Sequence, residues 1–142
     1  MKLSTRARYG TRALVELALH WGEGAVLLRD IASRQNIPLP YLEHLISPLV
    51  QAGIVKSTRG ARGGLSLAKS PEEITLSEVI PLLEGSIDLL DCVNNPESCP
   101  YSDTCVTRRI WVELKESMDK TLQSVTLQDL VTQENGNQST RR

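Results

Sequence analysis

Three cysteines, Cys92, Cys99 and Cys105, are the residues of this chain whose type and spacing best suit a chemical site. They are separated by six and then five residues, in and beside a short polar segment at residues 91–104 that offers little apolar core. Deprotonated cysteine is a soft ligand that binds iron–sulfur clusters and zinc. An odd number of cysteines argues against a disulfide framework. The segment therefore predicts a metal or redox site.

The cysteine spacing favours some of these chemistries over others. Structural zinc sites usually contain two ligands two to four residues apart and need a fourth ligand, and this spacing lacks such a pair. Three thiolates on a flexible segment suit an iron–sulfur cluster at least as well. A thiol switch without metal and buried structural cysteines are the remaining alternatives.

A long amphipathic helix is predicted from about Asp103, so that Cys105 lies in its first turn. Its apolar residues recur at three- and four-residue steps and form one stripe, which consists of Val106, Ile110, Leu114, Met118, Leu122 and Val125. A helix with such a stripe needs a partner that covers it. Residues 134–142 are polar or glycine, so we expect a disordered tail there.

The amino-terminal half contains three further predicted helices, at residues 5–20, 28–36 and 40–52, because apolar residues recur there with helical spacing. Pro48 lies inside the third and predicts a bend or an early end, since proline cannot donate the helical hydrogen bond. Beyond them, Thr75 and Glu78 form a capping box that predicts one more helix.

Two brief strands are expected at residues 54–58 and 65–67, on either side of the glycine-rich basic loop 59–64. Two short helices followed by a hairpin are typical of a winged helix-turn-helix. We therefore predict a mainly α fold of that class, with a small two-stranded wing and a long carboxy-terminal helix. The predicted domains are residues 1–70, which bind DNA, residues 71–133, which carry the cysteine segment and the dimerisation helices, and the tail.

Composition supports this class and excludes others. Phenylalanine is absent and aromatic residues make up 4%, so the core is built from Leu, Ile, Val and Ala, as in packed helices. The apolar runs are too short for a membrane span or a signal peptide, and we expect a cytoplasmic protein. His20 and His44 fall on different helices and no nucleophile–base pair is evident, so we do not expect an enzyme.

The charge is divided along the chain. The first 70 residues hold ten Lys and Arg against four Asp and Glu, although the whole chain has a net charge of −1. A basic half indicates contact with a polyanion. If helix 40–52 enters the major groove and the wing reaches the backbone or minor groove, the candidate DNA-binding residues are Tyr41, Glu43, His44, Arg59 and Arg62.

The segments Lys2–Tyr9, Pro40–Leu45 and Arg59–Gly64, together with the three cysteines, resemble the IscR family of iron–sulfur cluster regulators, which includes NsrR. The resemblance covers residues 1–133. It implies a homodimer in which the long helix crosses its partner, and a [2Fe–2S] or [4Fe–4S] cluster bound by the cysteines near the interface, of which we favour [2Fe–2S]. It also implies that Glu43 and Arg59 take part in DNA recognition.

The chain departs from this family at the fourth cluster ligand. Arg108 occupies the position where IscR-like proteins have a histidine, and Arg8 the position where NsrR-like proteins have a carboxylate from the other subunit. Asp91, Asp103 and Glu16 are alternative ligands, as is an exogenous thiol or water.

The resulting hypothesis is a dimeric repressor or activator whose promoter binding is controlled by an iron–sulfur cluster. It would act on genes of iron–sulfur biogenesis or of redox and nitrosative stress, with cluster-assembly proteins as possible partners. The alternative is a zinc- or thiol-based interaction adaptor that does not sense a cluster.

Overall fold

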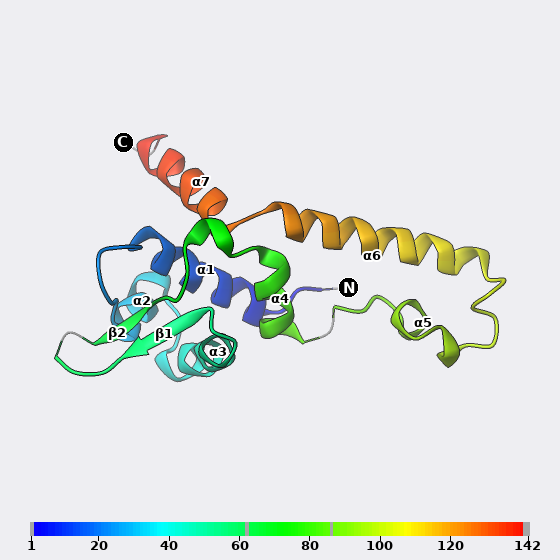
Figure 1. Cartoon of the computed structure of the whole chain (residues 1–142), viewed down its shortest axis with the longest axis horizontal. Helices are drawn as coiled ribbons and strands as arrows, with labels where there is room; N and C mark the ends of the chain where they lie inside the picture. The colour runs from blue at the N-terminus through cyan, green and yellow to red at the C-terminus, as the bar shows by residue number, and fades with distance from the viewer. Residues whose placement is uncertain (1, 62, 86, 141–142) are drawn as a thin grey trace.

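A computed structural model describes residues 2–61, 63–85 and 87–140. In chain order the elements are α1 (Thr5–Leu19), α2 (Leu28–Gln35), α3 (Leu39–Gln51), β1 (Val55–Thr58), β2 (Gly64–Leu67), η1 (Pro71–Glu73), α4 (Leu76–Glu84), α5 (Asp91–Asn94), η2 (Pro96–Ser98), α6 (Val106–Ser124) and α7 (Leu127–Thr140). Figure 1 shows a compact body and an arm, formed by α5 and α6, that extends away from it. The predicted mainly α winged helix-turn-helix class, with a two-stranded wing and a long helix near the carboxy terminus, is confirmed.

The helix-turn-helix consists of α2 and α3, joined by a short turn. Helix α2 ends at Gln35 and is capped by Asn36, whose backbone adopts the left-handed conformation (φ 55°) that asparagine tolerates better than most residues. Helix α3 continues to Gln51 in spite of Pro48, so the predicted early end is wrong. Buried Leu45 and Leu49 lie on either side of the proline and anchor this stretch of helix in the core.

The wing is an antiparallel hairpin in which Val55 pairs with Leu67 and Thr58 with Gly64. A bridge between Val26 and Leu65, with N···O distances of 2.8 and 2.7 Å, joins the hairpin to the segment before α2. Gly64 makes this approach possible, since a Cβ there would lie 2.6 Å from the Val26 carbonyl oxygen. The wing is thus fixed to the helix-turn-helix at its base.

One continuous core holds the compact body together. It contains Leu14 and Leu42 of the amino-terminal helices together with Ile74, Val79 and Leu127 from the later part of the chain. The packed core therefore extends past residue 70, where the sequence predicts a domain boundary.

Helix α7 continues through Thr140, where the sequence predicts a disordered tail from residue 134. Its start is stabilised by a reciprocal cap, in which the Asp129 N–H donates to the Thr126 hydroxyl (3.1 Å) and the Asp129 carboxylate accepts from the Thr126 N–H (2.9 Å). Leu127 and Val131 are buried in the core. Once these turns are anchored, each further residue adds one hydrogen bond to an existing helix. The polar composition of residues 134–140 does not reveal this extension of the helix.

Helices α1 and α4 meet where α1 begins. The Glu84 carboxylate, in the last turn of α4, accepts hydrogen bonds from the Ser4 N–H (2.9 Å), the Ala7 N–H (3.2 Å) and the Ser4 hydroxyl. The Ser4 hydroxyl and these N–H groups lower the pKa of Glu84. One turn further on, the helices touch so closely that a Cβ on Gly10 would lie 2.5 Å from Leu83 Cδ1.

The Glu84→Ala substitution removes the carboxylate that accepts these hydrogen bonds. We expect it to lower the free energy of unfolding by about 1 kcal/mol at pH 7. A lowered folded-state pKa stabilises the protein above the ordinary carboxyl pKa, and this stabilisation is lost as pH falls through the folded-state value. Urea unfolding of wild type and variant between pH 7 and pH 3 should therefore show a difference that shrinks on acidification. Glu73→Ala, an exposed carboxylate on η1, is the control; an equal loss in the two variants, or a difference independent of pH, would contradict the assignment.

Candidate functional site

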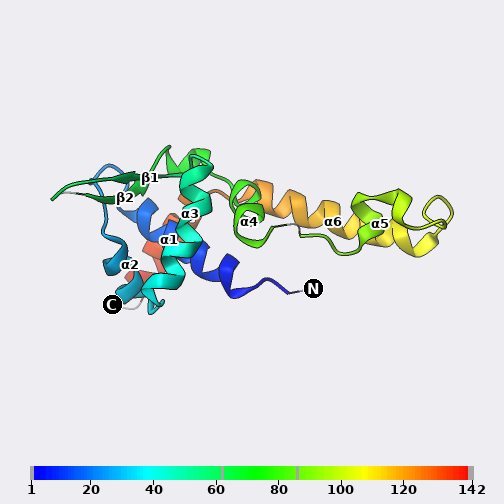
Figure 2. The same cartoon turned by 90° about the horizontal axis from the view of Figure 1, so that it is seen from below.

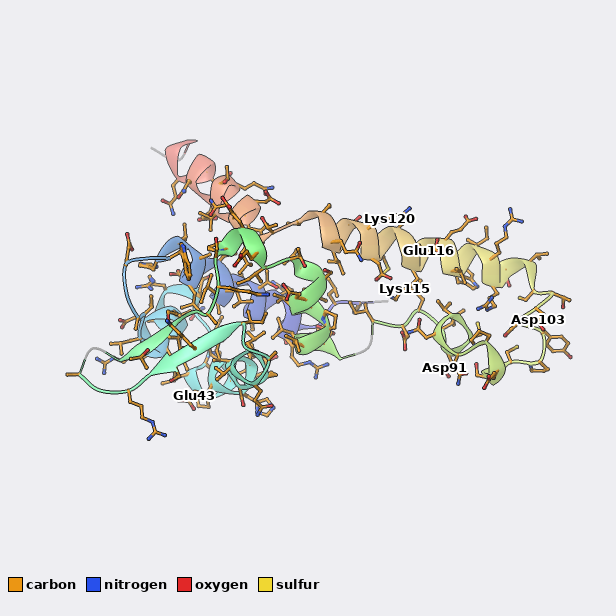
Figure 3. The ribbon with its side chains drawn as sticks, in the orientation of Figure 1. Glu43, Asp91, Asp103, Lys115, Glu116 and Lys120 are labelled. Carbon is orange, nitrogen blue, oxygen red and sulfur yellow. The ribbon has the colours of Figure 1, made fainter. Side chains whose placement is uncertain are left out.

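Helix α3 presents one face to the core and another to solvent. Leu42 and Leu45 are buried, whereas Glu43, His44 and Ser47 are exposed on the opposite side. Figure 3 shows Glu43 at the edge of α3 that faces away from the body. Two of the predicted DNA-binding residues, Glu43 and His44, thus lie together on the exposed face of the second helix of the helix-turn-helix.

Tyr41 is placed differently from these two residues. It is half-buried, and its hydroxyl lies 3.0 Å from the Thr5 hydroxyl on α1. Its ring meets the Tyr9 ring edge-on at a centroid distance of 6.1 Å. Tyr41 therefore links the first turn of α3 to α1.

The wing carries the remaining predicted residues. Arg59 follows β1 and is exposed, while Arg62 lies outside the described residues. Figures 1 and 2 show the hairpin loop reaching out on one side of α3. Arg59 and the face of α3 are presented to solvent from separate elements, as expected for groups that contact a large ligand at two places.

A polar network at the α1–α2 contact was not predicted. The Glu16 carboxylate accepts from Arg34 Nε (3.1 Å) and Gln35 Nε2 (2.7 Å), and Arg12 donates to Gln35 (2.9 Å). The signal in the sequence is that Glu16 lies on α1 beside the apolar residues Ala13 and Leu17, which are buried. Because Glu16 is only 8% exposed, its carboxylate needs hydrogen-bond partners. Both Glu16 oxygens are thus engaged within the compact body.

The cysteines all lie on the arm. Cys92 is in α5, Cys99 follows η2 and Cys105 directly precedes α6, and each is partly exposed. Arg108 Nε donates to the Cys92 carbonyl at 2.9 Å, which fixes α5 against the start of α6. The Ser102 hydroxyl donates to the Pro96 carbonyl at 2.6 Å and closes the loop between them. We refer to residues 91–105 as the cysteine loop.

Cys105 has the surroundings of a reactive thiol. A hydrogen bond with the Thr107 hydroxyl (Sγ···Oγ1 3.1 Å) is the largest influence that lowers its pKa, followed by the backbone N–H of Arg108 in the first turn of α6. Both interactions favour the thiolate, which is the form that binds metals and attacks disulfides.

The cysteine loop supplies suitable donors for an iron–sulfur cluster but does not bring them together. Across the described residues, no group of three Cys, His, Asp or Glu side chains is arranged to hold a metal ion. Asp91 and Asp103, two of the predicted fourth ligands, lie at separate points of the arm in Figure 3. A cluster held by all three thiolates therefore requires a loop conformation other than this one.

The apolar stripe of α6 is uncovered at its amino-terminal end, whereas Met118, Leu122 and Val125 are half-buried. None of the residues of α6 is buried, and Val106 and Ile110 are 82% and 53% exposed. The expectation that this helix needs a partner agrees with the exposure of its stripe within the single chain. A separate finding is that none of the helices in the described ranges has the length and apolar character needed to cross a membrane.

A helix-turn-helix with an exposed second-helix face, followed by a wing, defines a DNA-binding transcription regulator. The sequence profile of the Rrf2 family, described as iron-dependent transcriptional regulators, matches residues 3–133, and the chain belongs to this family. The resemblance to the IscR family is thereby confirmed, and the protein is a regulator rather than an enzyme.

Three relatives show how far the similarity extends. The protein rrf2 of Nitratidesulfovibrio vulgaris is 44% identical over 131 residues, which cover 92% of this chain and 87% of the relative. The structure of T. potens IscR is 41% identical and superimposes with a TM-score of 0.79 over 94% of this chain and 88% of that one. The structure of CymR, the global cysteine regulator of B. subtilis, is 38% identical and superimposes with a TM-score of 0.79 over 93% of this chain and 97% of that one.

The position of Tyr41 gives a test of its role. In Tyr41→Phe the hydrogen bond to Thr5 is lost, so we expect the free energy of unfolding to fall by about 0.5 kcal/mol, because the bond is exposed. Affinity for DNA should stay within about twofold of wild type. Urea unfolding and fluorescence anisotropy with labelled duplex measure the two effects, and Tyr101→Phe, an exposed tyrosine on the cysteine loop, is the control. A tenfold loss of affinity at unchanged stability would show instead that the hydroxyl contacts DNA.

Proposed function

We propose that the protein binds double-stranded DNA by inserting α3 into the major groove, with Glu43 and His44 facing the base edges. The observation that carries the proposal is that these side chains share the exposed face of α3 while the opposite face is held in the core. A carboxylate such as Glu43 can accept a hydrogen bond from the cytosine amino group. Arg59 of the wing, together with Arg62, contacts the phosphate backbone or the minor groove.

The active form in this proposal is a homodimer assembled through α6. The exposed members of the stripe, Val106, Ile110 and Leu114, support it, because apolar side chains left in solvent by their own chain stabilise a dimer when a second copy covers them. A dimer also places two copies of α3 in successive major grooves about 34 Å apart, so the operator would be an inverted repeat.

Control of DNA binding is assigned to an iron–sulfur cluster, [2Fe–2S] in preference to [4Fe–4S], held by Cys92, Cys99 and Cys105. Support comes from three thiols on one loop beside the proposed dimer helix, from the iron-dependent description of the family and from the similarity to T. potens IscR. The regulated genes would be those of iron–sulfur biogenesis or of redox and nitrosative stress. The protein would act in the cytoplasm, with cluster-assembly proteins as partners.

A second candidate is a regulator that responds through its thiols without a cluster. Two observations favour it: the described residues do not assemble a metal site, and the Cys105 thiol has a lowered pKa. The similarity to the structure of CymR, the global cysteine regulator of B. subtilis, supports this candidate.

The wing assignment predicts that Arg59→Ala weakens DNA binding by about tenfold, as expected when one charge-assisted contact is lost. The probe is the operator duplex, defined as the tightest-binding duplex that the wild-type protein selects from a random library. Anisotropy titrations at several salt concentrations should also show a shallower salt dependence, since fewer counterions are released. Lys120→Ala, which removes one exposed positive charge from α6, is the matched control. Equal affinities for Arg59→Ala and Lys120→Ala would refute the wing contact.

The cluster assignment predicts that protein purified without oxygen is coloured and contains iron and acid-labile sulfide. Each of Cys92→Ser, Cys99→Ser and Cys105→Ser should lose most of the visible absorption, because each removes one thiolate ligand. Thr104→Ala, an exposed change in the same loop, should keep it. A colourless protein without sulfide whose operator affinity changes on oxidation would replace the cluster with the thiol mechanism.

A further inference from the structure

The start of α1 carries a positive side chain that the proposed DNA interface does not yet use. Arg6 is exposed and lines a hollow of about 230 Å³ together with His44, Ser47 and Gln51 of α3. The Arg6 side chain of α1 therefore lies beside the solvent-exposed side of α3, next to His44, which follows Glu43 in the chain.

The N–H groups of Ser4, Arg6 and Ala7 at the start of α1 already have hydrogen-bond partners, whereas the charged side chain of Arg6 is open to an anion. The Arg6 N–H donates to the Ser4 hydroxyl (3.1 Å), and the Ser4 and Ala7 N–H groups donate to Glu84. Within the described ranges, the guanidinium of Arg6 forms no ion pair and no side-chain hydrogen bond. The Glu84 carboxylate accepts hydrogen bonds from Ser4 and Ala7, and the charge of Arg6 makes a smaller contribution to its lowered pKa.

The position of Arg6 is fixed relative to α3. Residue Thr5, its neighbour, shares a hydrogen bond of 3.0 Å with Tyr41, and the Tyr9 ring packs edge-on against the Tyr41 ring. Leu83 of α4 closes the inner side of the hollow, and its close approach to Gly10 holds α1 in place. A charged group on so constrained a helix turn meets its ligand with little loss of conformational entropy, apart from that of its own side chain.

The hairpin loop and the start of α1 lie on opposite sides of α3 in both Figure 1 and Figure 2. An α-helix with its side chains is about 10–12 Å across and fills a major groove about 12 Å wide. The two phosphate strands that border the groove then run along the two sides of the helix. With the wing on one side, the strand on the other side faces Arg6.

We propose that Arg6 is a DNA-backbone contact that binds a phosphate on the side of α3 opposite the wing. This inference rests on the proposed insertion of α3 into the major groove. Because phosphate is the same at every base pair, Arg6 contributes affinity and orientation and no sequence preference. Arg6 and Arg59 then hold the DNA from both sides of the recognition helix.

The test compares Arg6→Ala, Arg6→Lys, Arg59→Ala and Lys120→Ala as full-length proteins, using the operator duplex and a scrambled duplex of equal length. Arg6→Ala should weaken binding to both duplexes by a similar factor of about tenfold. The slope of log affinity against log salt should fall by about one unit for each bound protomer. Arg6→Lys, which keeps the charge, should recover most of the affinity, and Lys120→Ala should match wild type.

Each other outcome overturns the inference in a recognisable way. Wild-type affinity and salt slope in Arg6→Ala, with Arg59→Ala impaired, would remove the Arg6 contact and leave the proposed function standing. If both variants bound like wild type, the Arg6 contact and the wing contact would both be refuted. A loss confined to the operator duplex would make Arg6 a base-reading residue, and an Arg6→Lys variant as weak as Arg6→Ala at unchanged thermal stability would show that its charge is not what matters.

Discussion

The burial of α1 is the constraint on which the rest of the structure depends. Its apolar residues Ala13, Leu14 and Leu17 lie in a core shared by the helix-turn-helix, the wing, α4 and α7. Burying a leucine side chain contributes about 2 kcal/mol, and among the described residues α1 contacts α2, α3, α4, α7 and β2. Because α1 is held from several sides, the face of α3 and the base of the wing keep a fixed geometry before any DNA arrives.

Much of this arrangement could be predicted because it is written in local patterns. Helical periodicity gave the amino-terminal helices and α6, and the capping box at Thr75 gave α4, whose Glu78 carboxylate does accept the Thr75 N–H (3.4 Å). The polar end of α7 could not be predicted, because its helix depends on the burial of Leu127 and Val131 some residues earlier. Tertiary packing therefore determines the helical conformation of a segment whose composition predicts disorder.

The candidate site shows the same division. Exposure of Glu43 and His44 follows from their place on the polar side of a helix, which periodicity reveals. The partner of Tyr41 lies 36 residues away on α1, and no local signal identifies it. For the cysteines, spacing gives the number and type of donors, but whether three sulfurs converge depends on the path of a loop that contains little regular structure.

The length of α6 has a mechanical consequence. Nineteen residues at 1.5 Å each make a rigid rod of about 28 Å, joined to the compact body at one end, where Thr75 and Thr126 form a bridge, and bearing the cysteine loop at the other. A rotation of about ten degrees at the joined end displaces the far end by about 5 Å. Conversely, a displacement of a few ångströms at the far end requires only a small angular adjustment at the joint, so the arm works as a lever between a local rearrangement and the orientation of the body.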